Sequence, residues 1–288
     1  MYGLLLLSVF LMTANTALTK IFQRSLHFDL KSMAVYNLIN ALFACVIFLA
    51  SAGFRIRVNT PTLLYALVYA VIICINLSAQ ILALALVPVP VTTLMSVAGG
   101  VLIPAVFGVI YYGEPLTVRL ILSVVLILAA SALPLGGGVE GVSLKGAVAC
   151  AVMFLLGGAS VILVQLYSRA QGVCDSNSFF FLTNAVIGVL CLGLTVKDGI
   201  RQGFWNLLHL YNPSQLGMIA GKTALANICS MLQILILRQM AASSYAVLNS
   251  SLSLLGSVAL SAFCFREKQT KKGLLAVLLA IAALAVNP

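Results

Sequence analysis

Long apolar runs, separated by short polar breaks, fill nearly the whole chain. A helix needs about 20 apolar residues to cross a bilayer, and the bilayer leaves no backbone group unpaired. The runs do not alternate apolar with polar residues, which excludes a transmembrane barrel. Only 8% of the residues are charged and 62% are hydrophobic, far from a soluble composition. The sequence therefore predicts an all-α, multi-pass integral membrane protein, and we expect it in the cell (inner) membrane.

Breaking the sequence at its polar and turn-forming clusters gives ten predicted spans. They are Tyr2–Phe22, Lys31–Ala52, Pro61–Leu86, Val89–Tyr112, Thr117–Leu135, Leu144–Tyr167, Ser176–Val196, Ser214–Leu237, Ser243–Phe265 and Lys271–Val286. The breaks are rich in Pro, Gly and charged residues, which end one helix or begin the next.

The chain also repeats itself, because one offset of 153 positions aligns a long stretch of its first half with its second. Polar residues are scarce in the spans, so the polar matches are the informative ones: Gln80/Gln233, Glu114/Glu267 and Thr117/Thr270. We expect one repeat in residues 1–137 and a second in residues 138–288, with five spans in each. Because five is odd, the second repeat starts on the opposite face of the membrane. Inverted repeats of this kind are typical of secondary transporters.

Two loop motifs make a family resemblance specific. The segment Tyr112-Gly-Glu-Pro-Leu-Thr117 lies between the fourth and fifth spans, and Arg266-Glu-Lys-Gln-Thr270 lies between the ninth and tenth. With the five-plus-five arrangement, these motifs resemble the EamA-type branch of the drug/metabolite transporter superfamily. The resemblance covers nearly the whole chain and implies ten helices around a central cavity. It leaves the substrate open, because that superfamily exports or exchanges amino acids, nucleotide sugars, organic anions and drugs.

Lys222 is the one charged residue well inside a predicted span, about 12 Å from the start of the span. A lysine at the centre of a span costs roughly 2.5 to 3.5 kcal/mol on insertion scales, so it is a functional candidate by default. We expect Lys222 to face the cavity and to bind an anionic part of the substrate. The alternative is a lysine that snorkels to the headgroups or is capped by backbone carbonyls.

Amide and phenol side chains inside the spans complete the predicted substrate site. They are Asn15, Asn40, Asn76, Gln80, Asn184, Asn227, Gln233, Tyr245 and Asn249. Asn76 and Gln80 are four residues apart, as are Tyr245 and Asn249, so each pair shares one face of its helix. The alternative is that such side chains join neighbouring helices, at about 0.6 kcal/mol each.

None of the acidic residues lies inside a predicted span; they are Asp29, Glu114, Glu140, Asp175, Asp198 and Glu267. Proton-coupled export of cations needs an intramembrane carboxylate that holds proton and cation in turn, so this class is disfavoured. A membrane-embedded enzyme would need a His, Asp or Cys constellation, and the sequence offers none. His27 and His209 lie in loops without partners at ligand spacing, so we expect no metal and no cofactor.

The net charge of +10 comes from basic residues dispersed over the loops, as the positive-inside rule requires. We therefore expect membrane lipids and a small-molecule substrate as partners, but no nucleic acid, and a monomer or homodimer. Loops on the N-terminal side hold five basic residues and those on the other side ten, whereas the resemblance implies cytoplasmic termini. The orientation therefore stays open.

These features predict a secondary transporter, without ATP machinery of its own, that moves a small polar or anionic metabolite by alternating access. The alternative is a hydrophobic drug or metabolite efflux pump, which an aromatic-lined cavity would favour.

Overall fold

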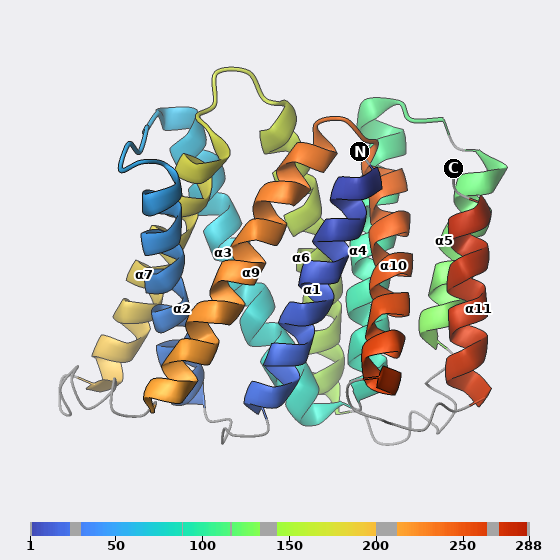
Figure 1. Ribbon diagram of the computed structural model, residues 1–288, viewed down its shortest axis with the longest axis horizontal. Helices are drawn as coiled ribbons and strands as arrows, with labels where there is room; N and C mark the ends of the chain where they lie inside the picture. The colour runs from blue at the N-terminus through green and yellow to red at the C-terminus, as the bar shows by residue number, and fades with distance from the viewer. Residues whose placement is uncertain are drawn as a thin grey trace. The chain divides into compact units, whose positions relative to one another are not determined.

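A computed structural model describes residues 2–23, 30–87, 89–115, 117–132, 143–199, 212–263 and 271–286. Ten α-helices and no strand lie within these residues (Figure 1). In chain order the helices are α1 (Tyr2–Gln23), α2 (Leu30–Ser51), α3 (Thr60–Leu86), α4 (Val89–Tyr112), α5 (Val118–Ala132), α6 (Leu144–Arg169), α7 (Ser176–Gly199), α9 (Pro213–Leu237), α10 (Ala242–Phe263) and α11 (Lys271–Val286). Each predicted span overlaps one helix, and its start agrees with the start of that helix within one residue. The predicted ends Leu135 and Phe265 lie outside the described residues.

Six of the described helices contain a segment long and apolar enough to cross a membrane. These segments are Ala34–Ser51, Thr60–Gln80, Met95–Tyr112, Leu144–Arg169, Ser176–Gly193 and Pro213–Leu237. Shorter apolar segments lie in α1, α5 and α11. Large side chains such as Ile110 and Leu144 are exposed on the surface, which lipid accommodates and water does not. The chain is therefore an integral membrane protein with an all-helical fold.

Capping side chains in the breaks explain where several helices begin. Asn59, Thr117, Ser143 and Asp175 each directly precede a helix, and each accepts a hydrogen bond from the backbone amide three residues later. Such bonds satisfy amides that have no partner inside the helix. Gln215 is the third residue of α9, and its side-chain oxygen accepts a hydrogen bond from the backbone amide of Asn212, which directly precedes the helix, as in a capping box.

The described helices fall into two compact units. Unit 1 comprises Met1–Thr13, Ile72–Arg169 and Gln233–Pro288, and unit 2 comprises Ala14–Val71 and Ala170–Leu232. Each unit takes segments from both predicted repeats. The two repeats, residues 1–137 and 138–288, were inferred from the sequence alone. The division of the chain into these repeats stays a prediction.

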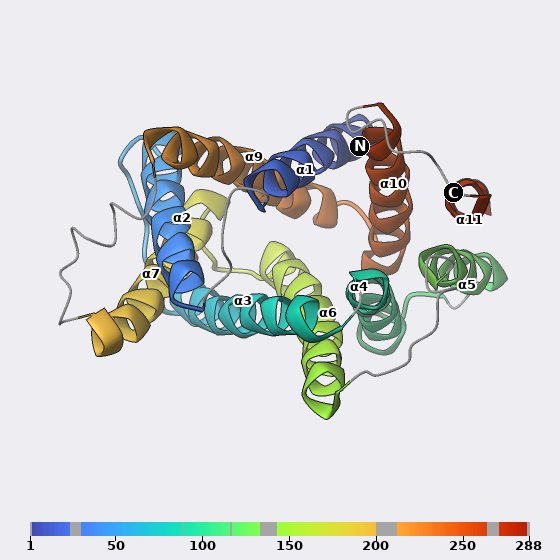
Figure 2. The ribbon, with the colours of Figure 1, turned by 90° about the horizontal axis from the view of Figure 1, so that it is seen from below.

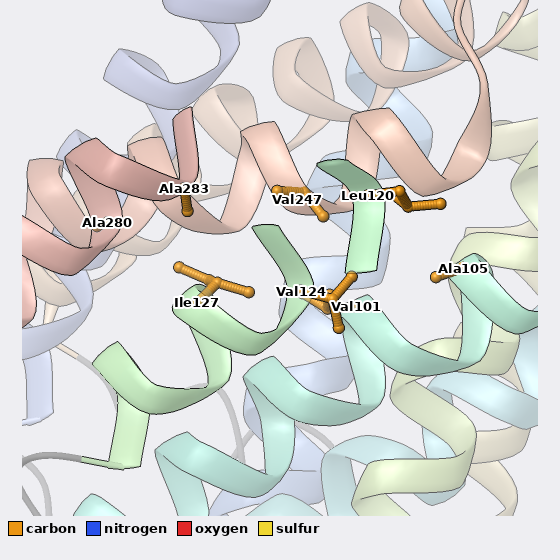
Figure 3. Packing of buried hydrophobic residues seen from close by; sticks show 8 residues of the cluster. All are labelled: Val101, Ala105, Leu120, Val124, Ile127, Val247, Ala280 and Ala283. Atoms are coloured by element: carbon orange, nitrogen blue, oxygen red, sulfur yellow. The ribbon is translucent and has the colours of Figure 1, made fainter. Parts of the chain in front are cut away.

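Unit 1 has an apolar core shared by α4, α5, α10 and α11 (Figure 3). Its buried members are Val101, Ala105, Leu120, Val124, Ile127, Val247, Ala280 and Ala283. Helices α5 and α11 run side by side in both views (Figures 1 and 2). The fully buried alanines of α11 leave room for Ile127 of α5. Lipid tails are as apolar as leucine, so close van der Waals packing of this kind holds the helices together.

A closer helix contact joins α4 and α6 in unit 1. A carbon atom added to Gly99 would overlap the backbone of Phe154, with the carbonyl carbon of Phe154 at 2.8 Å. A carbon atom added to Gly158 would lie 2.6 Å from the carbonyl oxygen of Gly99. Glycine at both positions therefore lets the two backbones touch.

Polar contacts hold the ends of three helices of unit 1. The guanidinium of Arg169 donates to the carbonyl of Met240 at 3.1 Å and lies 4.3 Å from the ring centroid of Tyr112. The hydroxyl of Ser243 donates to the carboxylate of Glu114. The end of α4, the end of α6 and the start of α10 are therefore tied together.

Unit 2 is built on the pair α2 and α7, which lie side by side in both views (Figures 1 and 2). The rings of Phe48 and Phe180 stack with their centroids 5.3 Å apart. The backbone amide of Cys174 donates to the buried hydroxyl of Thr62 at 2.8 Å, which ties the loop before α7 to α3. A second contact surface joins α2 to α9 through Val35, Ile39 and Ile219. The candidate functional site lies in this contact between α2 and α9.

Candidate functional site

Lys222 of α9 meets Tyr36 of α2 inside unit 2. The ammonium donates a hydrogen bond to the phenol oxygen at 2.5 Å and lies 5.0 Å from the centroid of the same ring. Both side chains are half-buried. The phenol oxygen therefore gives the cation a hydrogen-bond acceptor from the neighbouring helix.

A second polar contact lies beside the first. The hydroxyl of Thr223 is within hydrogen-bond distance of the amide oxygen of Asn40 and lies 2.7 Å from the carbonyl of Ile219. One hydroxyl carries one proton and donates to one of these acceptors at a time, so the Asn40 amide has capacity for a further partner. We call Tyr36, Asn40, Lys222 and Thr223 the polar ladder.

The sequence places these groups on facing surfaces of two helices. Tyr36 and Asn40 are four residues apart and therefore share one face of α2, while Lys222 and Thr223 are adjacent on α9. The apolar side chains of Val35, Ile39 and Ile219 pack in the same contact. The packing holds the two helices together, and the ladder crosses between them.

The ladder has a positive charge but no negative one. Lys222 is the only charged residue of the six membrane-crossing segments that does not lie near a segment end, and none of the acidic residues of the sequence falls inside any of them. Its contacts in the ladder are with a neutral phenol. An ammonium in such surroundings attracts an anion strongly, because little water is present to screen it.

Two further polar atoms of unit 2 are buried without a hydrogen-bond partner among the described residues. They are the amide nitrogen of Asn227 on α9 and the hydroxyl of Thr183 on α7. The side chains are 8% and 1% exposed, respectively. Buried polar groups are nearly always paired, so unpaired ones need a reason. Asn227 is four residues beyond Thr223 and thus continues the ladder's face of α9.

The predicted site residues divide between the units. Unit 2 holds Asn15, Asn40, Asn184, Lys222 and Asn227, and unit 1 holds Asn76, Gln80, Gln233, Tyr245 and Asn249. The structure brings Lys222 and Asn40 to the same pair of helices. The amide of Asn184 instead donates to the Phe180 carbonyl of its own helix, at 2.8 Å.

The five predicted residues of unit 1 lie on three helices, α3, α9 and α10. Gln80 is exposed on α3, and Asn76 and Gln233 are half-buried. Tyr245 is buried on α10, and Asn249 is half-buried one turn later on the same face. Their shared role in substrate binding stays a prediction.

Sequence reasoning missed Tyr36 and Thr223. Each stands beside a residue that was predicted, since Tyr36 precedes Asn40 by one helical turn and Thr223 follows Lys222 directly. A search for polar neighbours of each candidate on its own helix face would have found Tyr36. No local pattern, however, indicates that α2 and α9 pair.

We expect Tyr36→Phe to destabilise the protein by about 1 to 2 kcal/mol, because it keeps the ring but removes a hydrogen bond from a half-buried ammonium. The same change in a Lys222→Met background should cost close to nothing, since no ammonium remains. A double-mutant cycle on denaturant or thermal unfolding in detergent measures the difference. Equal costs in both backgrounds would show that the phenol acts independently of Lys222.

Twenty-eight chains of solved structures match this protein. One of them, described only as "Crystal structure of protein", superposes with a TM-score of 0.71 at 16% sequence identity, over 98% of this chain and 94% of that chain. No family model matches the sequence, and no curated protein matches it. At this identity the similarity shows a shared fold, so what the site does is argued from its own chemistry.

Proposed function

We propose that the protein is a secondary transporter that moves a small polar or anionic metabolite across the membrane by alternating access. In this proposal it is an EamA-like protein of ten spans, its two five-span repeats are inverted, and it is neither an enzyme nor dependent on a cofactor. Its substrate binds in a central cavity between the repeats. The observation that carries the proposal is the ammonium of Lys222, held inside the membrane by a phenol instead of a carboxylate.

The contact with Tyr36 supports this proposal over snorkelling. A snorkelling lysine lowers its cost by extending to the headgroups. Here the ammonium meets a side chain of a neighbouring span, and Asn40 and Thr223 follow in the same helix contact. Polar groups gathered around one cation are what an anionic ligand with additional hydroxyl or amide groups requires.

Hydrophobic drug efflux is the weaker candidate. The aromatic side chains that such a pump would present to its cargo are, in unit 2, largely used for packing: Phe48, Phe179 and Phe180 are buried, and their rings contact one another or Tyr69. Buried, mutually packed rings build a core and are not available to a ligand.

A thermal-unfolding screen of the purified chain tests the proposed function. The compounds are amino acids, nucleotides, nucleotide sugars, sugar phosphates and polyamines. A ligand at 100 times its dissociation constant stabilises the folded state by about 2.7 kcal/mol, so we expect an increase in the unfolding midpoint with one anionic class. Stabilisation by polyamines, with none by any anion, would contradict the proposal.

A further inference from the structure

An apolar groove runs between α3 and α6 of unit 1. Its volume is about 460 Å³, and its walls include Ile75, Ala79 and Leu82 of α3 and Val148 and Val152 of α6. One charged residue, Lys145, also lines it. Lys145 is exposed and is the second residue of α6, so the cation stands at the end of the groove where a membrane helix begins.

The shape of the groove suits an acyl chain. From Lys145 to Val152 α6 rises by about 10 Å, so the groove extends from the helix start along the span. The groove is open on its outer side, where Val148 and Leu82 are exposed. The side chain of Lys145 is long enough to follow such a surface with its stem and to keep its ammonium at headgroup level.

A second groove of unit 1 provides an internal comparison. It lies between α4 and α6, has a volume of about 380 Å³ and is lined by apolar side chains such as Leu102, Val106 and Phe154. No charged residue is among its lining residues. The two grooves therefore differ in one feature, the fixed positive charge of Lys145. A fixed positive charge on the protein is what can discriminate between anionic and zwitterionic lipid headgroups.

We propose that the α3–α6 groove binds one acyl chain of an anionic phospholipid, with the lipid phosphate held by Lys145. A zwitterionic lipid carries its own ammonium beside the phosphate, so it gains less from a fixed cation. One basic residue near an anionic headgroup is worth about 1 kcal/mol, which is about a fivefold preference. The α4–α6 groove takes acyl chains without regard to headgroup.

Native mass spectrometry of the purified full-length chain tests the proposal. The protein is incubated with equal amounts of phosphatidylglycerol and phosphatidylcholine that carry identical acyl chains. We expect more retained phosphatidylglycerol than phosphatidylcholine in the wild type. The α3–α6 groove alone should give about a fivefold ratio, and the total should fall to about twofold because the α4–α6 groove retains both lipids equally. Lys145→Gln should bring this ratio to about one, and Lys145→Arg should keep it. Arg119→Gln removes the same charge from an exposed position at the start of α5 and should leave the ratio unchanged.

The chain also offers a matched pair of variants for the grooves. Val148 and Val106 are 55% and 54% exposed, one in each groove. Val148→Trp fills the α3–α6 groove and should abolish the preference for the anionic lipid. Val106→Trp fills the other groove and should lower retention of both lipids, and the ratio should rise towards about fivefold because only the selective groove remains.

Three results would overturn the proposal. The first is a preference that survives Lys145→Gln, and the second is one that survives Val148→Trp. The third is competition by glycerol phosphate as effective as that by phosphatidylglycerol, which would mean a phosphate site without an acyl chain. Because binding is read from retained lipid, the outcome does not depend on whether the protein transports the proposed substrate.

Discussion

Replacing Lys222 with glutamine is expected to lower the uptake of the anionic substrate by about ten- to a hundredfold. Glutamine keeps much of the length and polarity but removes the charge, and a hydrogen bond to a charged group contributes about 1.5 to 3 kcal/mol. The measurement is initial uptake, at subsaturating concentration, of the anion identified by thermal unfolding, into liposomes containing the protein. Lys222→Arg keeps the charge and should keep part of the activity.

The control for this experiment is Arg119→Gln, which makes the same change of charge at an exposed position outside the polar ladder. It should transport like the wild type. Lys222→Gln should also elute as a folded species and unfold at no lower temperature than the wild type, because it removes a half-buried charge. Equal uptake by Lys222→Gln and the wild type would return Lys222 to a snorkelling role. Loss of uptake together with loss of folding would instead assign it a structural one.

The helices themselves were predictable because the bilayer imposes a simple rule. Apolar runs of sufficient length become helices, and the breaks carry the residues that cap them. The predicted span Val89–Tyr112 matches α4 at both ends, and its last residue precedes a glycine with positive φ, Gly113, which stops the helix. The predicted end of the fifth span, Leu135, lies outside the described residues, and α5 is described to Ala132.

The candidate site was predictable only in part. Lys222 stands out in any reading of the sequence, because a charge inside an apolar run is costly and therefore rare. Its partner Tyr36 is one of nine tyrosines and is 186 residues away, so its role depends on how two distant helices pack. Gln80 was selected because the repeat pairs it with Gln233 and because it shares a helix face with Asn76. It lies exposed on α3, so its place in the site still rests on these two sequence patterns.

The sequence also does not indicate which single residues make a helix–helix contact. Helices α4 and α6 each carry a pair of adjacent glycines, Gly99-Gly100 on α4 and Gly157-Gly158 on α6. Small residues indicate close helix approach, but the pattern does not say which member of each pair makes the contact. The structure decides it, because Gly99 and Gly158 face the neighbouring helix, whereas a carbon atom on Gly100 or Gly157 would meet nothing within 4 Å.

Gly99→Ala is therefore expected to destabilise the protein by about 3 kcal/mol or more. The added methyl group meets the backbone of Phe154, which cannot move aside as a flexible side chain would, and overpacking costs typically 1 to 3 kcal/mol even where side chains yield. Gly100→Ala, one residue away on the same helix, should be neutral or should stabilise by about 0.5 to 1 kcal/mol, because alanine favours the helix over glycine. Thermal unfolding in detergent, with size-exclusion chromatography for the folded fraction, measures both.

The same contrast should hold on the facing helix, where Gly158→Ala meets Ile103 and the carbonyl of Gly99 while Gly157→Ala meets open space. The two damaging changes act on one contact, so Gly99→Ala and Gly158→Ala together should cost less than the sum of their separate effects. Once the helices have been forced apart by the first methyl group, the second finds room. If all four variants unfold at the same temperature, α4 and α6 are not in backbone contact. A full sum of costs in the double variant would mean that the two glycines act at separate contacts.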